Sequence, residues 1–347
     1  MIMRSVVYNC VMRVGVAGAS GYAGTELVRL LAGHPDLELV VATAQRNAGG
    51  SIAEHSPSLI GAVGSMTYAP NSSEVLDGLD VVFLALPHGE SQKLVPGLKG
   101  SVGTIIDLGA DFRLPADSYE AWYGQAHLAP ELCAEAVYGL VERARDDLRG
   151  ASLVAVPGCY PTATTLAFAP FVDAGVIETT GIIVDAASGV SGAGRAASDH
   201  LHFSAVDENF TAYGLLDHRH TGEMEMTLGA SVLFTPHLAP MVRGMLVTGY
   251  ARPIGALGTD EAMEILHAAY DDEVFVHVVD APPSTKDTTG SNSAHLTARV
   301  DPRTNHLLVL SAIDNLGKGA AGQAVQCANV ALGFDEATGL SAIGVYP

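Results

Sequence analysis

The chain is poor in charged residues and has no basic run. Of its 347 residues only 16% are charged, and 18 Lys+Arg stand against 38 Asp+Glu, a formal net charge of −20. Polyanion binding depends on Lys and Arg, so the sequence predicts no nucleic-acid partner and no anionic membrane surface. The 48% of hydrophobic residues exclude a disordered or fibrous chain, and this length favours two domains with separate cores.

Cysteine is also scarce. The four cysteines are Cys10, Cys133, Cys159 and Cys327. They are too few and too scattered for a disulfide scaffold, and no pair has the C-x-x-C spacing of a zinc site. No secretory signal is visible, and prolines interrupt the longest uncharged stretch, residues 150–172. We therefore expect reduced thiols, no membrane segment and a cytoplasmic location.

Short apolar runs alternate with helical stretches in the first half of the chain. The runs are residues 14–17, 37–43, 81–86, 104–108 and 153–156. A helical stretch, residues 25–32, follows the first of them. This alternation predicts an α/β fold with a Rossmann-type, doubly wound parallel sheet.

Beyond about Gly158 the pattern changes to β-branched or alternating runs with few helical stretches between them. These runs are residues 182–186, 245–250, 274–279, 295–300 and 307–312. They predict a second, α+β domain built on a mixed sheet. A last helix, about residues 318–332, has apolar residues at helical spacing.

A glycine-rich turn, G-x-x-G-x-x-G, joins the first predicted strand to the first predicted helix. It is a relative of the dinucleotide fingerprint, in which glycines let the backbone approach a pyrophosphate held at a helix N-terminus. The contacts expected here are Gly18, Ser20, Gly21, Tyr22 and Gly24. The second strand ends without a carboxylate, and the first charged residue after it, Arg46, favours NADP over NAD. The alternative for the glycine-rich turn is close strand-to-helix packing without a ligand, and the alternative for Arg46 is an ordinary solvated arginine.

Cys159 follows a buried run and precedes a helical stretch. A helix N-terminus stabilises a thiolate and lowers the pKa of the thiol, so a cysteine at this position is a candidate nucleophile. The alternative, a small buried hydrophobe, suits the other three cysteines. A thiolate beside a nicotinamide indicates thioester chemistry at a carbonyl, with hydride transfer to or from the cofactor.

These motifs together resemble the N-acetyl-γ-glutamyl-phosphate reductases, over nearly the whole chain from Met12. The segments that carry the resemblance are residues 18–24, 157–162, 188–195, 218–223 and 314–319. Three of these segments also have counterparts in the related aspartate-semialdehyde dehydrogenases. One departure is Gly222, where the family commonly has proline.

The resemblance implies an NADPH-dependent enzyme of arginine biosynthesis that reduces an acyl phosphate, N-acetyl-γ-glutamyl phosphate, to its semialdehyde through a Cys159 thioester. It also implies an NADP domain of residues 1–158 plus 318–347, and a catalytic and oligomerisation domain of residues 159–317. A homo-oligomer, dimer or tetramer, is expected.

The remaining roles are assigned from the residues and the resemblance together. His220 is favoured as the acid/base because imidazole titrates near neutral pH, with His218 as the competing assignment. The substrate contacts expected are Arg113, Arg195 and Glu223, although a structural salt bridge is the alternative for either arginine. Further cofactor contacts are expected at Pro87, His88, Ser188, Gly189, Gly192, Asn315 and Lys318. No metal is expected, because H-x-H with one Glu lacks further ligands.

Two alternatives stay open at this point. One is an acyl-phosphate reductase of the aspartate-semialdehyde dehydrogenase type. The other is a catalytically silent NADP-binding module, which requires Cys159 to be unreactive.

Overall fold

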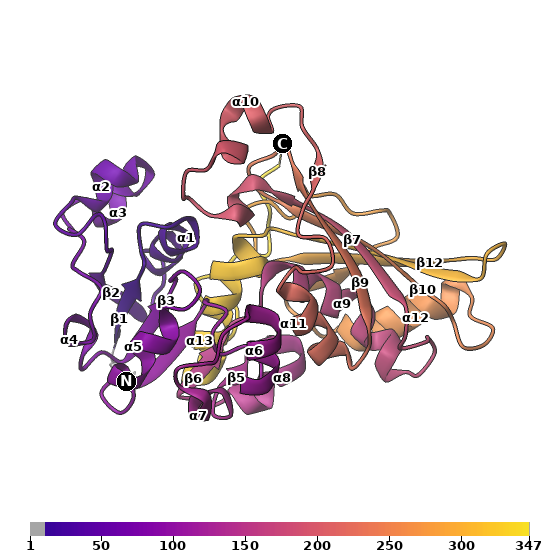
Figure 1. Cartoon of the computed structure of the whole chain (residues 1–347), viewed down its shortest axis with the longest axis horizontal. Coiled ribbons are helices and arrows are strands. Elements are labelled where there is room, and N and C mark those ends of the chain that lie inside the picture. The colour runs from indigo at the N-terminus through magenta and orange to yellow at the C-terminus, as the bar shows by residue number, and fades with distance from the viewer. Residues whose placement is uncertain (1–10, 347) are drawn as a thin grey trace, which may run out of the picture.

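A computed structural model describes residues 11–346 and shows two units, each built on one sheet (Figure 1). The first sheet has six strands, all parallel, in the order β2-β1-β3-β4-β6-β5. Its strands are β1 (Met12–Ala17), β2 (Leu37–Ala42), β3 (Val81–Leu84), β4 (Thr104–Asp107), β5 (Val137–Tyr138) and β6 (Leu153–Ala155). The predicted Rossmann-type sheet is confirmed.

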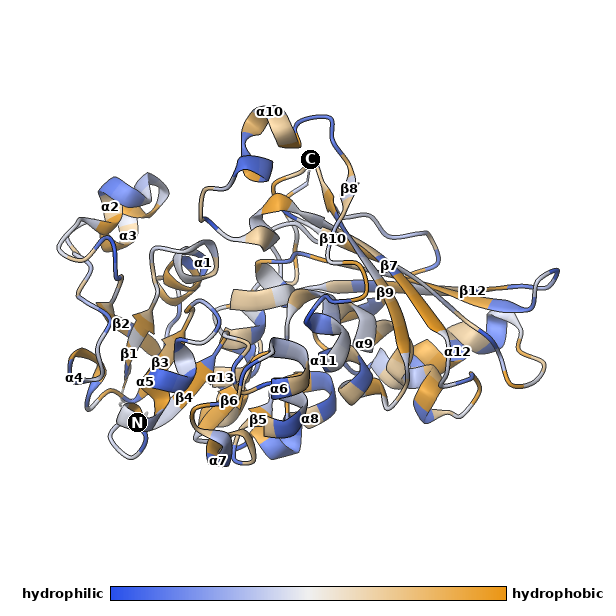
Figure 2. Ribbon diagram, in the orientation of Figure 1, coloured by the Kyte–Doolittle hydropathy of each residue, from blue (hydrophilic) through white to orange (hydrophobic). Residues whose placement is uncertain are grey.

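Helices cover this sheet and fill the connections between its strands. The longer ones are α1 (Tyr22–Leu31), α5 (Ser91–Leu98), α6 (Ala116–Tyr123) and α8 (Val141–Leu148). Short helical turns are α2 (Ile52–His55), η1 (Pro57–Leu59), α3 (Ile60–Val63), α4 (Ser73–Leu76) and α7 (Pro130–Cys133). In Figure 2 the strands β4 and β6 are largely hydrophobic, whereas α8 is largely hydrophilic, as a solvent-facing helix should be.

The second sheet has seven strands in the order β11-β12-β13-β10-β7-β9-β8, with both parallel and antiparallel pairs. Its strands are β7 (Ile182–Gly189), β8 (Thr211–Ala212), β9 (Val232–Ala239), β10 (Met245–Ala251), β11 (Val276–Val278), β12 (Ala294–Asp301) and β13 (His306–Ile313). Its helices are α9 (Cys159–Asp173), α10 (Phe203–Val206), α11 (His220–Leu228) and α12 (Thr259–Tyr270), with 3-10 turns η2 (Val190–Ala193) and η3 (Asp199–Leu201). The predicted mixed sheet is confirmed as well.

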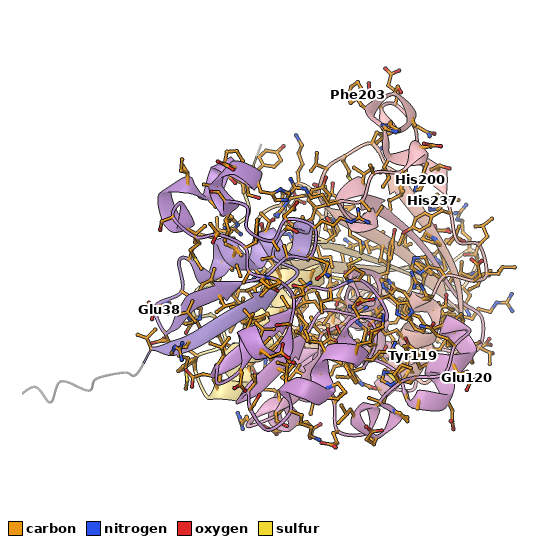
Figure 3. All side chains as sticks on the ribbon, turned by 60° about the vertical axis from the view of Figure 1, so that its left-hand side comes forward. Glu38, Tyr119, Glu120, His200, Phe203 and His237 are labelled. Carbon is orange, nitrogen blue, oxygen red and sulfur yellow. The ribbon has the colours of Figure 1, made fainter. Side chains whose placement is uncertain are left out.

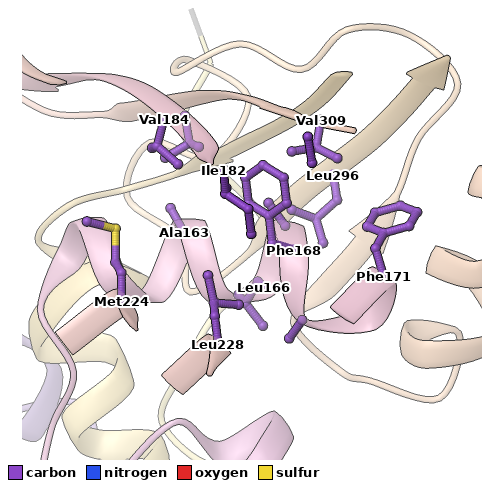
Figure 4. Close-up of a cluster of buried hydrophobic side chains, with 14 of the residues drawn as sticks. Ala163, Leu166, Phe168, Phe171, Ile182, Val184, Met224, Leu228, Leu296 and Val309 are labelled. Atoms are coloured by element: carbon purple, nitrogen blue, oxygen red, sulfur yellow. The ribbon is translucent and has the colours of Figure 1, made fainter. Parts of the chain in front are cut away.

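Helix α9 is the centre of the second core. All residues from Tyr160 to Phe171 are buried, and the helix packs against α11, α12, β10 and β13. Figure 4 shows Phe168 of α9 among Ile182, Leu296 and Val309 of the sheet, and Leu166 beside Leu228 of α11. A helix enclosed on every side is held rigidly, so the position of its first residue is fixed by the core.

The chain returns to the first unit at its C-terminal end. A π-helical turn, η4 (Gly317–Ala321), leads from β13 into α13 (Gly322–Leu332), which packs against α1, α8 and β4. Ala324, Val325 and Ala328 of α13 belong to the core of the first sheet. Residues far apart in sequence, α9 and η4, therefore meet where the two units join.

The segment with η3 and α10 projects from the second unit, and Phe203, which is 81% exposed, lies near its tip (Figure 3). This segment connects η2 to β8. It is stabilised by few apolar contacts, since no residue of η3 or α10 is buried.

Candidate active site

A cavity of about 780 Å³ opens at the carboxyl ends of the first sheet, lined by residues of both units. That edge is where parallel α/β sheets bind ligands. Among the residues singled out from the sequence, those that line it are Gly18, Ser20, Gly21, Tyr22, Gly24, Arg46, Pro87, Arg113, Cys159, Gly192, Arg195, His220 and Asn315. Those that do not are His88, Ser188, Gly189, His218, Glu223 and Lys318.

The glycine-rich turn is built by close backbone contacts that only glycine permits. Gly18 has φ +76°, and a Cβ on it would lie 2.3 Å from the carbonyl oxygen of Ala85. A Cβ on Gly24 would lie 2.2 Å from the carbonyl oxygen of Gly18, which sets how closely α1 packs on β1. Gly21, in contrast, has room beside it and caps α1, which has no acidic residue in its first turn. This N-terminus therefore suits a phosphate.

Two further loops complete this side of the cavity. Arg46 and Asn47 follow β2, and Asn47 Nδ2 lies 3.5 Å from His55 Nδ1. His55 Nε2 in turn lies 3.1 Å from the carbonyl oxygen of Ser20 in the glycine-rich turn. The turn and the loop after β2 are thus tied together through His55.

Cys159 is the first residue of α9, as the sequence predicted, and its thiol is partly accessible from the cavity. Gly319 of η4 packs directly on it, since a Cβ on Gly319 would lie 2.8 Å from the Cβ of Cys159. Burial raises the pKa of the Cys159 thiol to about 11, and the backbone hydrogen bond at Tyr160 and the charge of Arg113 only partly oppose this. The expectation of a lowered thiol pKa is therefore wrong for the chain without ligand, because the helix terminus does not offset the loss of water.

The other described cysteines are not part of the site. Burial raises the pKa of Cys133 to about 11 and that of Cys327 further still. Cys327 donates a hydrogen bond to the carbonyl oxygen of Gly139, at 3.0 Å. Cys10 lies outside the described residues.

His220 begins α11 and lies beside the residue that precedes the cysteine. A Cβ on Gly158 would lie 2.6 Å from His220 Nε2 and 2.9 Å from Arg113 Nη1, so the chain needs glycine there. Burial lowers the pKa of His220 well below its usual range, and the neighbouring His218, Arg113 and Arg219 add to the effect. The imidazole is therefore neutral at pH 7 and able to accept a proton.

His218 lies behind His220 and away from the cavity. Its Nδ1 accepts a hydrogen bond from the backbone N–H of His220 at 3.2 Å, and its ring packs edge-on against Tyr160 and Tyr213. Burial, with the charge of Arg219, lowers the pKa of His218 to about 4. Of the two histidines, the geometry favours His220 for contact with a reacting group.

Glu223 is a buried anchor. Its Oε1 accepts hydrogen bonds from the backbone N–H of Gly158 (2.7 Å) and from the hydroxyl of Tyr138 (2.8 Å). Its Oε2 lies 3.3 Å from Arg113 Nη1. Both oxygens of Glu223 contact protein groups, so the side chain fixes Gly158 and Arg113 in place, and its contact with substrate stays a prediction. Tyr138 was missed because it lies in a two-residue strand without a recognisable pattern.

Arg113 reaches the cavity from the loop after β4. Its Nη2 donates to the carbonyl oxygen of Leu108 at 2.8 Å. Its Nη1 contacts Glu223 and lies next to the backbone of Gly158. The guanidinium is thus fixed beside His220 in the wall of the cavity.

Lys318 does not line the cavity. Its side chain is fully buried, and its ammonium lies 2.5 Å from Glu142 Oε1 and 2.7 Å from Gln326 Oε1. The amine faces α8 and α13 and not the cavity. In the structure the ammonium of Lys318 is held by Glu142 and Gln326, and its contact with the cofactor stays a prediction.

The other predicted cofactor residues divide in the same way. Asn315 lines the cavity and holds η2 in place, since its Nδ2 donates to Ser191 Oγ at 2.9 Å. Ser188 donates to the carbonyl oxygen of Gly189 at 3.1 Å and supports Gly192 from behind. His88 lies in a second cavity, of about 390 Å³, with its Nδ1 3.0 Å from Asp111.

Within residues 11–346, no group of three or more His, Cys, Asp or Glu side chains is placed to hold a metal ion. No helix in that range is both long enough and apolar enough to cross a bilayer.

The chain is similar to known proteins of one family along nearly its whole length. Two family profiles match, "Semialdehyde dehydrogenase, NAD binding domain" over residues 13–151 and "Semialdehyde dehydrogenase, dimerisation domain" over residues 159–315. The N-acetyl-γ-glutamyl-phosphate reductase of Symbiobacterium thermophilum is 50% identical, covering 97% of this chain and 99% of that protein. That of Desulforamulus reducens is 46% identical, covering 97% and 100%.

Solved structures show the same fold at low sequence identity. Aspartate semialdehyde dehydrogenase II from Vibrio cholerae superposes with a TM-score of 0.69 at 18% identity, covering 92% of this chain and 97% of that one. The enzyme from Candida albicans, solved with NADP, gives a TM-score of 0.65 at 17% identity, covering 92% and 98%.

Proposed function

The chain belongs to the N-acetyl-γ-glutamyl-phosphate reductases, oxidoreductases of the semialdehyde dehydrogenase family, and from this premise we propose that it reduces N-acetyl-γ-glutamyl phosphate to N-acetylglutamate semialdehyde with NADPH. One observation carries the proposal: Cys159 and His220 converge on the cavity that the glycine-rich turn also lines. A nucleophile, a proton acceptor and a dinucleotide site are then in one place.

The residues present fit a phosphorylated dinucleotide. Gly21 leaves the N-terminus of α1 open, and Arg46 supplies a cation after β2, where no carboxylate competes for the ribose 2′-oxygen. Asn315 and Gly192 line the cavity on the side of the second unit. When bound, NADPH supplies the hydride.

Proton transfer in this mechanism starts from two neutral groups. The pKa of Cys159 is raised and that of His220 is lowered by burial, so the resting pair is a thiol and a neutral imidazole. His220 accepts the thiol proton as Cys159 Sγ forms its bond to the γ-acyl carbon. The phosphate departs with the electron pair of the broken C–O bond and takes a proton from solvent.

The second half of the reaction returns the enzyme to its starting state. With the cofactor bound, a hydride supplied to the thioester carbon would leave a tetrahedral alkoxide on Cys159, which the N-terminus of α9 and the Arg113 charge would stabilise. Collapse of the alkoxide releases the aldehyde and expels the Cys159 thiolate. The imidazolium of His220 then returns its proton to sulfur.

The assay that tests the proposal runs the reaction in reverse. Purified protein is given phosphate, NADP⁺ and either N-acetylglutamate semialdehyde or aspartate semialdehyde, and reduced cofactor is followed by absorbance. We expect phosphate-dependent reduction with the N-acetylated substrate. Preference for aspartate semialdehyde would identify the other acyl-phosphate reductase, and no turnover with either would identify a silent NADP-binding module.

We also propose that the protein is a cytoplasmic homo-oligomer, a dimer or tetramer. Three large apolar side chains on adjacent strands of the second sheet are exposed, Ile183, Leu233 and Tyr250. Ile183 is in register with both of the others. An apolar row on an exposed sheet face is typical of a subunit contact, and size-exclusion chromatography with light scattering tests it.

A further inference from the structure

Arg195 extends from the second unit across the cavity to the first. Its Nη1 donates to the carbonyl oxygen of Ser20 at 3.2 Å, and its Nη2 donates to that of His55 at 3.3 Å. Its guanidinium carbon lies 5.8 Å from the centre of the Tyr22 ring. All three partners belong to the first unit, so Arg195, which the sequence had suggested as a substrate contact, lies at the glycine-rich turn, where the cofactor is expected.

The charge on Arg195 is not neutralised by the protein. Of the arginines among residues 11–346 that line the cavity, Arg113 is paired with Glu223, whereas Arg46 and Arg195 have no carboxylate partner. This is notable in a chain with 38 Asp+Glu and 18 Lys+Arg. Two exposed guanidinium groups left without a carboxylate, on one cavity, form a site for an anion.

The two arginines are neighbours through a short chain of contacts. Arg195 donates to the His55 carbonyl oxygen, and the His55 ring lies 3.5 Å from the side chain of Asn47, the residue next to Arg46. The loop after the second strand is where the ribose 2′-position of a bound dinucleotide lies. Arg195 therefore faces the adenosine-ribose part of the cavity.

We propose that Arg195, together with Arg46, binds the 2′-phosphate of NADP(H), so that one cofactor phosphate is held by both units. The inference rests on the proposed function, because it takes NADP(H) as the cofactor. The carbonyl contacts of Arg195 are exchanged for phosphate oxygens, which a guanidinium binds in a bidentate, charge-assisted manner. Selection of NADP over NAD then depends on an arginine from the catalytic unit as well as on Arg46.

The segment that carries Arg195 suits this role. Its base is fixed, because Asn315 holds Ser191 and the backbone N–H of Val190 donates to the carbonyl oxygen of Met241 at 2.9 Å. Gly194, with φ +84°, then turns the chain toward the cavity and leaves space around itself. Because residues 190–191 are held in place and Gly194 is unhindered, the Arg195 guanidinium can adjust its position to a phosphate.

Calorimetric titration with adenosine 2′,5′-bisphosphate and with 5′-AMP tests the proposal without any turnover. For Arg195→Ala we expect roughly 10- to 100-fold weaker binding of the bisphosphate, because charge-assisted hydrogen bonds to the 2′-phosphate are lost. The affinity for 5′-AMP, which lacks that phosphate, should be unchanged. Arg46→Ala serves as the positive comparison and Arg195→Lys should lie between. Equal weakening of both nucleotides, or none, overturns the proposal.

A matched control separates local binding from net charge. Arg303 is 85% exposed and paired with Asp301 in the β12–β13 turn, far from the cavity, so Arg303→Ala removes the same charge and should leave both affinities unchanged. Thermal melting shows whether each variant is folded. In turnover assays, a raised KM for the acyl phosphate with an unchanged KM for NADPH would show that Arg195 binds substrate and not the cofactor phosphate. A wild-type protein without activity would refute the proposed reductase function but would leave the nucleotide-binding result unaffected.

Discussion

The indole of Trp122 packs directly on Gly222. A Cβ on Gly222 would lie 2.2 Å from Trp122 Nε1 and 2.4 Å from its Cδ1. Trp122, the only tryptophan, is on α6 of the first unit, and Gly222 is in the first turn of α11, between His220 and Glu223. Gly222 is therefore matched to an indole that occupies the space of any side chain.

Gly222→Ala should displace the catalytic turn. We expect a several-fold lower kcat and a lower melting temperature, because overpacking forces either the indole or α11 to move. The same substitution made in a Trp122→Ala background should cost much less, a non-additive result in a double-mutant cycle. Gly61→Ala, in α3 with nothing near its Cβ position, is the control and should change neither quantity. Equal costs in both backgrounds would contradict the coupling.

Cys159→Ser should lose nearly all turnover while it still binds NADP, since the hydroxyl is a far weaker nucleophile than sulfur. Alkylation by iodoacetamide should abolish activity in the wild type and accelerate steadily above pH 9, because the pKa of the Cys159 thiol is raised to about 11. Cys133→Ser, in α7 and outside the cavity, should remain active and remain sensitive to alkylation. Retained turnover in Cys159→Ser would rule out the covalent route.

The sequence predicted the parts of this site that depend on backbone pattern. Parallel strands, the glycine-rich turn and a cysteine at a helix start all follow from local periodicity and from glycine placement. Strand β9 (Val232–Ala239) was missed, because Pro236 and His237 interrupt its alternation, although it pairs with β7 along its whole length.

Side-chain direction was harder to predict. Glu223 and Lys318 lie in motifs that surround the cavity, yet both point into protein, toward Gly158 and toward Glu142. Their direction is set by where α11 and η4 pack against the first unit, which is tertiary information. The raised thiol pKa of Cys159 has the same origin, since it depends on burial by residues distant in sequence.

Lowering the pH should destabilise the protein through its buried histidines. The pKa of His220 is lowered well below its usual range, so between pH 6.5 and that lower value the unfolded chain binds a proton that the folded chain does not. The free energy of unfolding therefore falls as the pH falls, and His220 contributes at most about 2 kcal/mol to this fall between pH 7.5 and 5. His218, with a pKa of about 4, acts in the same direction.

The measurement compares urea unfolding of wild type and His220→Gln at the two pH values. We expect the variant to lose less stability on acidification than the wild type does. His200→Gln, exposed in the η3 turn (Figure 3), is the matched control and should follow the wild type. An identical pH dependence for His220→Gln and the wild type would mean that His220 has the same pKa in the folded and unfolded chain, which would contradict the prediction.

The buried pair of Lys318 and Glu142 joins η4 to α8, and both side chains are fully buried. Lys318→Met leaves the Glu142 carboxylate buried without its partner, so we expect a loss of about 3–5 kcal/mol in the free energy of unfolding by urea. Adding Glu142→Gln removes that unpaired charge and should recover more than half of the loss. The exposed pair Lys93–Glu90 gives the comparison, since Lys93→Met should cost less than about 1 kcal/mol.

Turnover should also depend on the Lys318–Glu142 pair, because η4 carries Gly319, which packs on Cys159. If the ion pair only stabilises the fold, the double variant recovers both stability and kcat. If it also holds η4 in register against the cysteine, the double variant recovers stability but keeps a reduced kcat with an unchanged KM for NADPH, since Lys318 does not line the cofactor cavity. We expect the second result, because removing the ammonium also removes its hydrogen bond to Gln326, which aligns η4 with α13.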